Sequence, residues 1–152
     1  MKAFKLLCCL ALFLCGQAAL AWDRPVMSKY GAFYQGPEQL VVQLAHTAAD
    51  DHAIIRISGI NHPWDGRVFW AEVRYQPGHH ERVNYVTRAE DGSERTLLYV
   101  EDGNGSLSLP NWRGALWAQV RVSYWRDAST EVRPEHLATD YEKQIGQIKE
   151  GR

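Results

Sequence analysis

All three cysteines of the chain fall within its first 15 residues, and the rest of the sequence has none. The same segment has the pattern of an export signal, with two lysines near its start, an apolar run over 6–14 and a small-x-small cleavage site ending at Ala21. The sequence therefore predicts a signal peptide over 1–21 and a single domain over 22–152 that folds without a disulfide. The cysteines of the predicted signal are Cys8, Cys9 and Cys15.

The absence of cysteine also bears on the compartment in which this domain works. Small secreted domains in oxidising compartments are often held together by disulfides, so a domain without cysteine fits a bacterial periplasm. We therefore predict a periplasmic protein, with secretion outside the cell as the alternative. The apolar run is too short for a membrane span, which takes about 20 residues. A bulky Leu14 before Cys15 also differs from a lipoprotein signal, so we expect simple cleavage.

The charge of the predicted domain argues against one class of partner. Without the two lysines of the signal, the formal net charge is −3, from 15 basic and 18 acidic residues. The basic residues are scattered and form no run or stripe, so we expect no nucleic-acid partner. The chain is instead rich in aromatic residues, with six Trp and seven Tyr. Because each aromatic side chain buries roughly 150–250 Å², a few of them can build the core.

From Tyr30 onward the sequence breaks into short apolar runs separated by turn signals, which is typical of an all-β domain. We predict a mainly β fold, an antiparallel β-sandwich of about seven strands. The segment 38–45 also fits a helical stripe, but its paired valines and short length favour a strand. The most regular strand has an apolar face formed by Leu116, Ala118, Val120, Val122 and Tyr124. The expected strands are 30–34, 38–45, 53–58, 68–76, 82–88, 96–101 and 115–126, with a short piece at 107–109.

The end of the chain changes to a helical period. Pro134 suits the first position of a helix, and apolar residues then recur at spacings of four, four and three. This pattern predicts one C-terminal amphipathic α-helix over 134–149, which Gly146 weakens near its end. The apolar stripe consists of Leu137, Tyr141, Ile145 and Ile148.

One group of loops carries candidate residues for binding a partner. If consecutive strands pair as antiparallel hairpins, their connections alternate between the two ends of the sheet. The loop at 59–67, the turn at 89–94 and the segment 110–114 then share one end. This end carries two tryptophans, a residue type that dominates binding hot spots, although both rings can instead cap the core. The candidate partner-binding residues are His62, Trp64, Asp65, Asn111, Trp112 and Arg113.

The opposite end gathers histidines and carboxylates, the residue types that bind Zn²⁺. It comprises the segments 46–52, 77–81 and 102–106. The spacing of these histidines matches no compact metal motif, and the adjacent pair follows a Pro-Gly turn. We therefore predict no metal and no other cofactor, and keep four histidines as the alternative ligands. They are His46, His52, His79 and His80.

No catalytic motif is present. The predicted domain has no cysteine nucleophile, no Gly-x-Ser-x-Gly, no His-Glu-x-x-His and no phosphate-binding glycine loop. A glycosidase needs a carboxyl group in an apolar setting, and only Glu72, between Ala71 and Val73, has such neighbours. A surface pair between Glu72 and Arg74 is the simpler interpretation, so we predict that the protein is not an enzyme.

We therefore expect an exported binding protein, a periplasmic inhibitor or immunity-type protein that blocks a protein partner such as an exported hydrolase or toxin. In broad layout the chain resembles periplasmic immunity proteins and lysozyme inhibitors. The resemblance covers architecture only, and it implies no residue roles. One alternative is a carbohydrate-binding module in which Trp64, Trp112 or Trp125 stacks on sugar rings. The other is a metal-binding protein or metal-dependent enzyme that uses the loop histidines.

Overall fold

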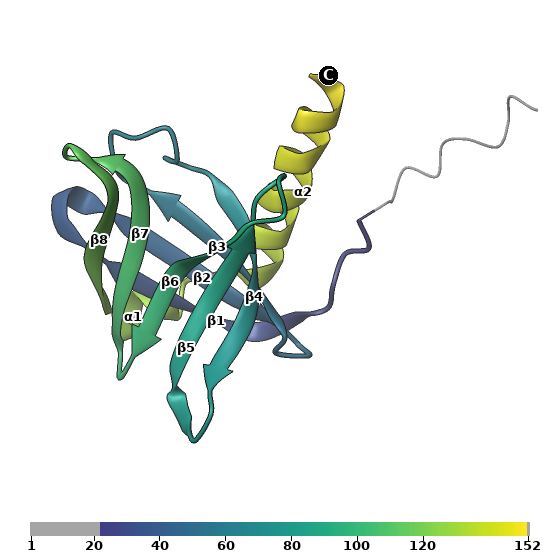
Figure 1. Ribbon diagram of the computed structural model, residues 1–152. Helices are drawn as coiled ribbons and strands as arrows, with labels where there is room; N and C mark the ends of the chain where they lie inside the picture. Colours follow the sequence, from purple (N-terminus) through teal and green to yellow (C-terminus); the bar gives the residue numbers. More distant parts are fainter. Residues whose placement is uncertain (1–21, 152) are drawn as a thin grey trace, which may run out of the picture.

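The computed structural model describes residues 22–151, which form a closed antiparallel barrel of eight strands (Figure 1). The predicted signal peptide and its cysteines lie outside the described residues. The prediction of a mainly β fold with a C-terminal helix is confirmed, but the sandwich of about seven strands is wrong. The strands are β1 (Met27–Gln35), β2 (Val41–Thr47), β3 (His52–Ser58), β4 (Val68–Gln76), β5 (His79–Arg88), β6 (Glu94–Glu101), β7 (Asn104–Trp112) and β8 (Ala115–Tyr124).

The barrel closes because every strand pairs with its neighbour in sequence and β1 also pairs with β8. The segment expected as a short piece at 107–109 is the middle of the full strand β7, which supplies the eighth strand. No connection crosses between two sheets, as a sandwich would require. Eight strands enclose a space just wide enough for side chains to fill.

The barrel interior is an apolar core. On β3, Ala53, Ile55 and Ile57 point inward and are fully buried, as expected for side chains that alternate along a strand. On β8, Val120 and Val122 belong to the same core. Other fully buried side chains of the interior are Leu40, Val42, Leu97, Leu98, Leu107 and Leu109.

The two ends of the predicted core face on β8 leave the barrel. Leu116 is 76% exposed and Tyr124 is 44% exposed, because the strand extends past the core at both ends. The strand also ends earlier than expected, at Tyr124, where the chain turns into the short helix α1 (Arg126–Ser129). A short 3₁₀ turn, η1 (Pro37–Gln39), leads into β2, so the predicted strand over 38–45 is confirmed from Val41 onward.

A second, smaller core lies between the outside of the barrel and the helix α2 (Pro134–Glu150), which lies against β1 to β4 (Figure 1). The predicted helix over 134–149 is confirmed, and Leu137 is buried beneath it. Its apolar stripe does not stay on the barrel to the end, since Ile148 is 48% exposed. Residues 22–151 contain no helix with the length and apolar character needed to span a membrane. The buried residues of this second core are Met27, Ala45, Ile54, Val68, Val132, Leu137 and Ala138.

Polar side chains fasten α2 to the barrel. The side-chain amide of Gln144 accepts a hydrogen bond from the backbone N–H of Val68 at 2.8 Å and donates one to its C=O at 2.7 Å. One turn earlier, Asp140 accepts a hydrogen bond from Arg56 at 2.8 Å. The amide of Gln144 therefore satisfies both backbone groups of a buried residue at the start of β4.

The contact between β1 and β8 is short. Only Tyr34 pairs with Tyr124 and Gln35 with Ser123. At Phe33 the partners of the backbone groups come from α1 and the residue before it instead, because Ser129 Oγ accepts the Phe33 N–H at 2.9 Å and the backbone N–H of residue 125 donates to the Phe33 C=O at 2.9 Å. The first half of β1 therefore pairs with β2 alone, and the barrel wall is interrupted beside it.

Candidate binding sites at the two ends of the barrel

The strand order places the loop at 59–67 and the β7–β8 hairpin at the same end of the barrel, as the alternation of connections predicts (Figure 1). We call this the tryptophan end, defined by residues 59–67 and 110–117. The ring of His62 lies 6.0 Å from that of Trp112, and the ring of Trp64 lies 6.2 Å from that of Trp117. The loop and the hairpin are therefore packed together.

His62 joins the loop to the hairpin as a structural bridge. The backbone N–H of Trp64 donates to His62 Nδ1 at 3.0 Å, and His62 Nε2 lies 2.7 Å from the carbonyl oxygen of Pro110. Because Nδ1 accepts, this neutral ring carries its proton on Nε2 and donates it to Pro110. Both ring nitrogens are thus used within the protein.

The two predicted tryptophans cap the core. Trp112 is 8% exposed and belongs to the core of the barrel interior, and half-buried Trp64 packs against it beside Phe69. Their rings are tilted steeply against their neighbours, with 60° between Trp64 and Trp117. Trp112 therefore caps the core, as the alternative to partner binding predicts, and only part of Trp64 is accessible.

The exposed residues of the tryptophan end lie around these rings. Asp65 is exposed, and its carboxylate accepts the backbone N–H of Ile60 at 3.3 Å, which stabilises the loop. Arg113 is exposed and forms an ion pair with Glu38 of η1. Leu116, expected in the core, lies three residues after Arg113 and is the most exposed apolar side chain described at this end. The turn signal before it could have shown that this residue lies at the tip of the hairpin.

The tip of the β7–β8 hairpin has a backbone that its sequence does not favour. Trp112 pairs with Ala115, so Arg113 and Gly114 form a two-residue turn with φ angles of 48° and 81°. This turn favours Asn, Asp or Gly at both positions. A left-handed conformation costs an ordinary residue roughly 1–2 kcal/mol. Arg113 is therefore held in a strained conformation, which is a feature that often accompanies function.

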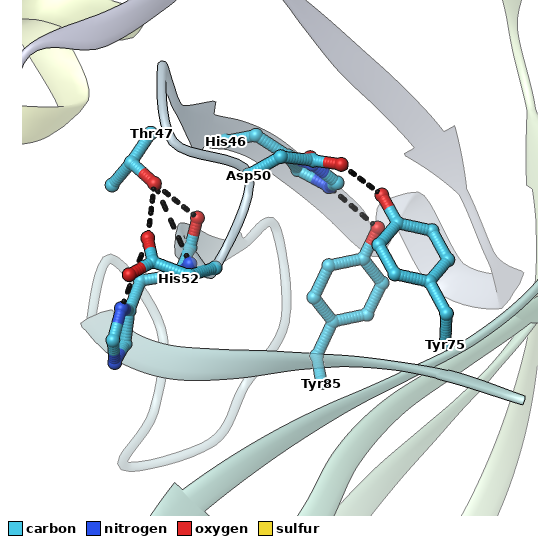
Figure 2. A network of polar contacts seen from close by, with 7 residues as sticks. His46, Thr47, Asp50, His52, Tyr75 and Tyr85 are labelled. Atoms are coloured by element: carbon cyan, nitrogen blue, oxygen red, sulfur yellow. Dashed lines mark hydrogen bonds and ion pairs between the residues drawn. The ribbon is translucent and has the colours of Figure 1, made fainter.

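At the opposite end, four side chains from three strands and a turn form a hydrogen-bonded network (Figure 2). Asp50, on the turn between β2 and β3, contacts His46 Nδ1 through one oxygen and accepts the hydroxyl of Tyr75 at 2.6 Å through the other. His46 Nε2 lies 2.8 Å from the hydroxyl oxygen of Tyr85. We call this the mouth network: His46, Asp50, Tyr75 and Tyr85.

The protonation of the mouth network follows from these contacts. Partial burial would raise the pKa of Asp50, but hydrogen bonds from Tyr75 and His46 outweigh it and hold that pKa below its ordinary value. The carboxylate only accepts, so His46 carries a proton on Nδ1, and in the neutral ring Nε2 accepts the Tyr85 hydroxyl. Burial, together with neighbouring hydroxyl groups and Asp50, raises the pKa of Tyr85. Tyr85 therefore stays un-ionised and is poorly suited to act as a nucleophile.

The mouth network borders a pocket of about 420 Å³. The pocket is lined by β1, β2, the turn between β2 and β3, and β5, and its β1 residues include the first half of that strand, which has no β8 partner. This volume falls in the usual range for small-molecule sites, roughly 300–1,000 Å³. Its polar or aromatic lining residues are Ser28, Tyr30, Tyr34, His46, Thr47, Asp50 and Tyr85.

The candidate metal ligands do not converge. His46 faces the barrel mouth, whereas His52 stacks on Trp70 outside the barrel, with ring centroids 4.8 Å apart. His79 lies at the start of β5, and the side chain of His80 is not described. Among the side chains that the structure describes, no group of three or more His, Cys, Asp or Glu is placed to hold a metal ion.

The one carboxyl group considered for catalysis forms the surface pair that the sequence favours. Arg74 donates two hydrogen bonds of 2.9 Å to Glu72, and these hold the pKa of Glu72 below its ordinary value. A general acid needs the opposite shift. Comparison of the chain with protein-family models, with curated proteins and with solved structures gives no match. The function is therefore inferred from the fold and from the residues at the two ends of the barrel.

Proposed function

We propose that this protein is an exported, non-catalytic binding protein of the periplasm that blocks a protein partner with its tryptophan end. The observation that carries the proposal is the tip of the β7–β8 hairpin. Arg113 is exposed in a strained turn that follows the buried Trp112, and the exposed Leu116 lies two residues after that turn. Arginine is enriched at binding hot spots, and an exposed leucine nearby offers apolar area that a partner can bury.

Rigidity supports the same proposal. Trp112 is buried under the turn, His62 ties the loop at 59–67 to Pro110, and Glu38 holds Arg113 from the side. A surface fixed before binding loses little conformational entropy on association. In this proposal Leu116, Arg113, Asn111 and Asp65 contact the partner, and Trp112 and His62 support them.

The geometry favours a protein partner over a sugar. A sugar-binding platform needs exposed rings that lie parallel to a sugar face. Trp112 is buried, and the planes of Trp64 and Trp117 meet at 60°. Trp125 is 47% exposed, but it packs edge-to-face against Phe33, in the first strand of the barrel. A protruding tip that enters a cleft in another protein fits the tryptophan end better.

Quantitative affinity capture tests this proposal. The purified protein, a Leu116→Asp variant and a Val26→Asp control are immobilised and exposed to periplasmic and culture-medium extracts. Leu116 and Val26 are 76% and 77% exposed, so the two substitutions are matched in chemistry and burial. We expect wild type and control to recover the same exported hydrolase in stoichiometric amount, and Leu116→Asp to lose it.

The activity of the captured hydrolase then tests the blocking role. We expect its turnover of its own substrate to fall as wild-type protein is added and to be unaffected by Leu116→Asp. Equal capture by Leu116→Asp and wild type would show that the tryptophan end is not the contact surface. Capture without any loss of hydrolase activity would refute the inhibitor proposal.

A further inference from the structure

The pocket at the mouth network lies at the opposite end of the barrel from the proposed partner surface. Binding of a partner at the tryptophan end therefore gives this pocket no role. Its floor contains two tyrosines that are almost fully buried, Tyr34 at 6% and Tyr85 at 3% exposure. Tyrosine hydroxyls usually find a hydrogen-bond partner when they are buried. Tyr34 lines the pocket, and its hydroxyl makes no hydrogen bond to the part of the chain that the structure describes. No inaccessible polar side-chain atom of the described residues lacks a partner, so this hydroxyl is accessible and its bonding capacity is unused.

The free donors and acceptors of the side chains around the pocket show what kind of group it can bind. The Tyr75 hydroxyl proton goes to Asp50, and with a neutral His46 ring the Tyr85 hydroxyl proton goes to His46 Nε2, so both donors are then used inside the network. The oxygens of Tyr85 and Asp50 keep free lone pairs, because a hydroxyl oxygen has two and a carboxylate about four. Tyr34 adds a further acceptor and the one hydroxyl proton of these groups that remains free. The part of the pocket formed by Asp50, Tyr34 and Tyr85 therefore offers more acceptors than donors, and the nearby Ser28 and Tyr30 hydroxyls can act as either.

The charges of the pocket point in the same direction. Among the lining residues that the structure describes, Asp50 is the only acid and none is a lysine or arginine. The carboxylate of Asp51 lies close enough to interact with Asp50. Aromatic rings also attract cations through the negative potential of their faces. A positively charged hydrogen-bond donor with a small body is the ligand chemistry that meets all of these conditions.

We propose that the mouth pocket binds a protonated primary amine, with its ammonium group donating to Asp50 and to the hydroxyl oxygens of Tyr34 and Tyr85. The ammonium supplies three N–H donors to this acceptor-rich lining, and its charge is balanced by Asp50. The same group occurs on free organic amines and on lysine side chains, and both present it in the same way.

Calorimetric titration of the purified protein with phenethylamine, 2-phenylethanol and 3-phenylpropanoate tests the ammonium requirement. The three probes share an aromatic body and differ in whether they end in an ammonium, a hydroxyl or a carboxylate. We expect phenethylamine to bind at millimolar concentration or below, about tenfold to a hundredfold more tightly than 2-phenylethanol, because hydrogen bonds to charged groups are stronger. We expect no binding of 3-phenylpropanoate.

Two variants and a matched control test the site. Asp50→Asn removes the charge, and Tyr34→Phe removes the free hydroxyl without touching the mouth network. Asp51→Asn removes the neighbouring charge, which pairs with Thr47 and His52 and does not line the pocket. We expect phenethylamine affinity to fall about tenfold or more in Asp50→Asn and measurably in Tyr34→Phe, with a smaller loss in Asp51→Asn.

The source of the amine is tested with Nα-acetyl-lysine-N-methylamide, which carries the ammonium on a peptide backbone. Stronger binding of this probe than of phenethylamine assigns the site to lysine side chains, and the reverse order assigns it to free amines. Equal binding of the amine and the alcohol, no binding of either amine, or undiminished binding in folded Tyr34→Phe and Asp50→Asn would overturn the proposal. None of these results depends on capture at the tryptophan end, so the two proposals fail separately.

Discussion

Because Trp112 caps the core, its removal should lower the stability of the domain by a predictable amount. Its side chain is 8% exposed and closes the barrel interior beneath the β7–β8 turn. Truncating a buried tryptophan to alanine removes its apolar contacts and leaves a cavity, which costs about 3–5 kcal/mol. We therefore expect Trp112→Ala to lower the free energy of unfolding by about 3–5 kcal/mol, a large part of the roughly 5–15 kcal/mol that stabilises a typical domain.

The expected change in melting temperature follows from the size of the domain. Unfolding entropy is about 2.1 cal/mol/K per residue, so about 130 residues give about 0.27 kcal/mol/K. A loss of about 3–5 kcal/mol then lowers Tm by about 11–18 °C. Urea unfolding followed by far-UV circular dichroism measures the free energy directly, and an unchanged m value would show that the unfolded state is not altered.

Two further variants make this result interpretable. Trp64→Ala, at a half-buried ring, should cost less than half as much, and Leu116→Ala, at an exposed tip, should change stability by less than about 0.5 kcal/mol. A Trp112→Ala protein within about 1 kcal/mol of wild type would refute the capping argument. Trp112 would then be free to serve as a contact residue, as the sequence allows.

Three other predictions concern single contacts. Arg113→Asn should raise the free energy of unfolding by up to about 1 kcal/mol, because asparagine tolerates the left-handed turn and the lost ion pair is exposed. Gln144→Ala should lower it by about 1–3 kcal/mol, because the buried backbone groups of Val68 lose their partner. Hydrogen bonds from arginines, Arg74 foremost, lower the pKa of Glu94 from 4.5 to about 2. The stabilisation from Glu94 is thus present above pH 4.5 and lost as the pH falls toward 2, and Glu94→Gln should remove this part of the acid dependence.

Matched controls accompany these three variants, all measured by urea unfolding. Asp102→Ala, at the other turn of the same geometry, should lose stability where Arg113→Asn gains it, and a loss in both would contradict the strain argument. Gln147→Ala, at an exposed position of α2, should be nearly neutral. For Glu94, parallel stability curves of wild type and Glu94→Gln between pH 4.5 and pH 2 would show that its ion pairs contribute nothing.

The sequence predicts the individual strands and the C-terminal helix better than it predicts the closure of the barrel. Alternation on 68–76 and the 3.6-residue period after Pro134 depend on residues close in sequence, and both elements appear as expected. The turn signals at Pro110 and Asn111 predict only a short piece where the structure has the full strand β7, because proline is tolerated at strand positions whose N–H needs no partner. Closure depends on the pairing of β1 with β8, and no pattern within either strand encodes that pairing.

The two candidate sites also differ in how far the sequence predicts them. Loop parity brings together the residues of the tryptophan end, because parity needs only the order of the strands. It cannot show whether a ring points into the barrel, so the sequence leaves both the capping and the binding interpretation of Trp112 open. The mouth network joins His46 and Asp50, which the sequence places on one turn, to Tyr75 and Tyr85 from separate strands. Tertiary structure alone sets that convergence.

The short contact between β1 and β8 has a consequence for the assembled chain. Phe33 obtains its backbone partners from residues 125 and 129, so the turn into α1 covers an edge that the sheet itself leaves open. Uncovered strand edges pair readily with other chains and promote aggregation. A chain truncated after Tyr124 would keep all eight strand sequences but expose this edge. Such a truncated chain should associate through β1. The segment after Tyr124 therefore also keeps copies of the chain from associating with one another.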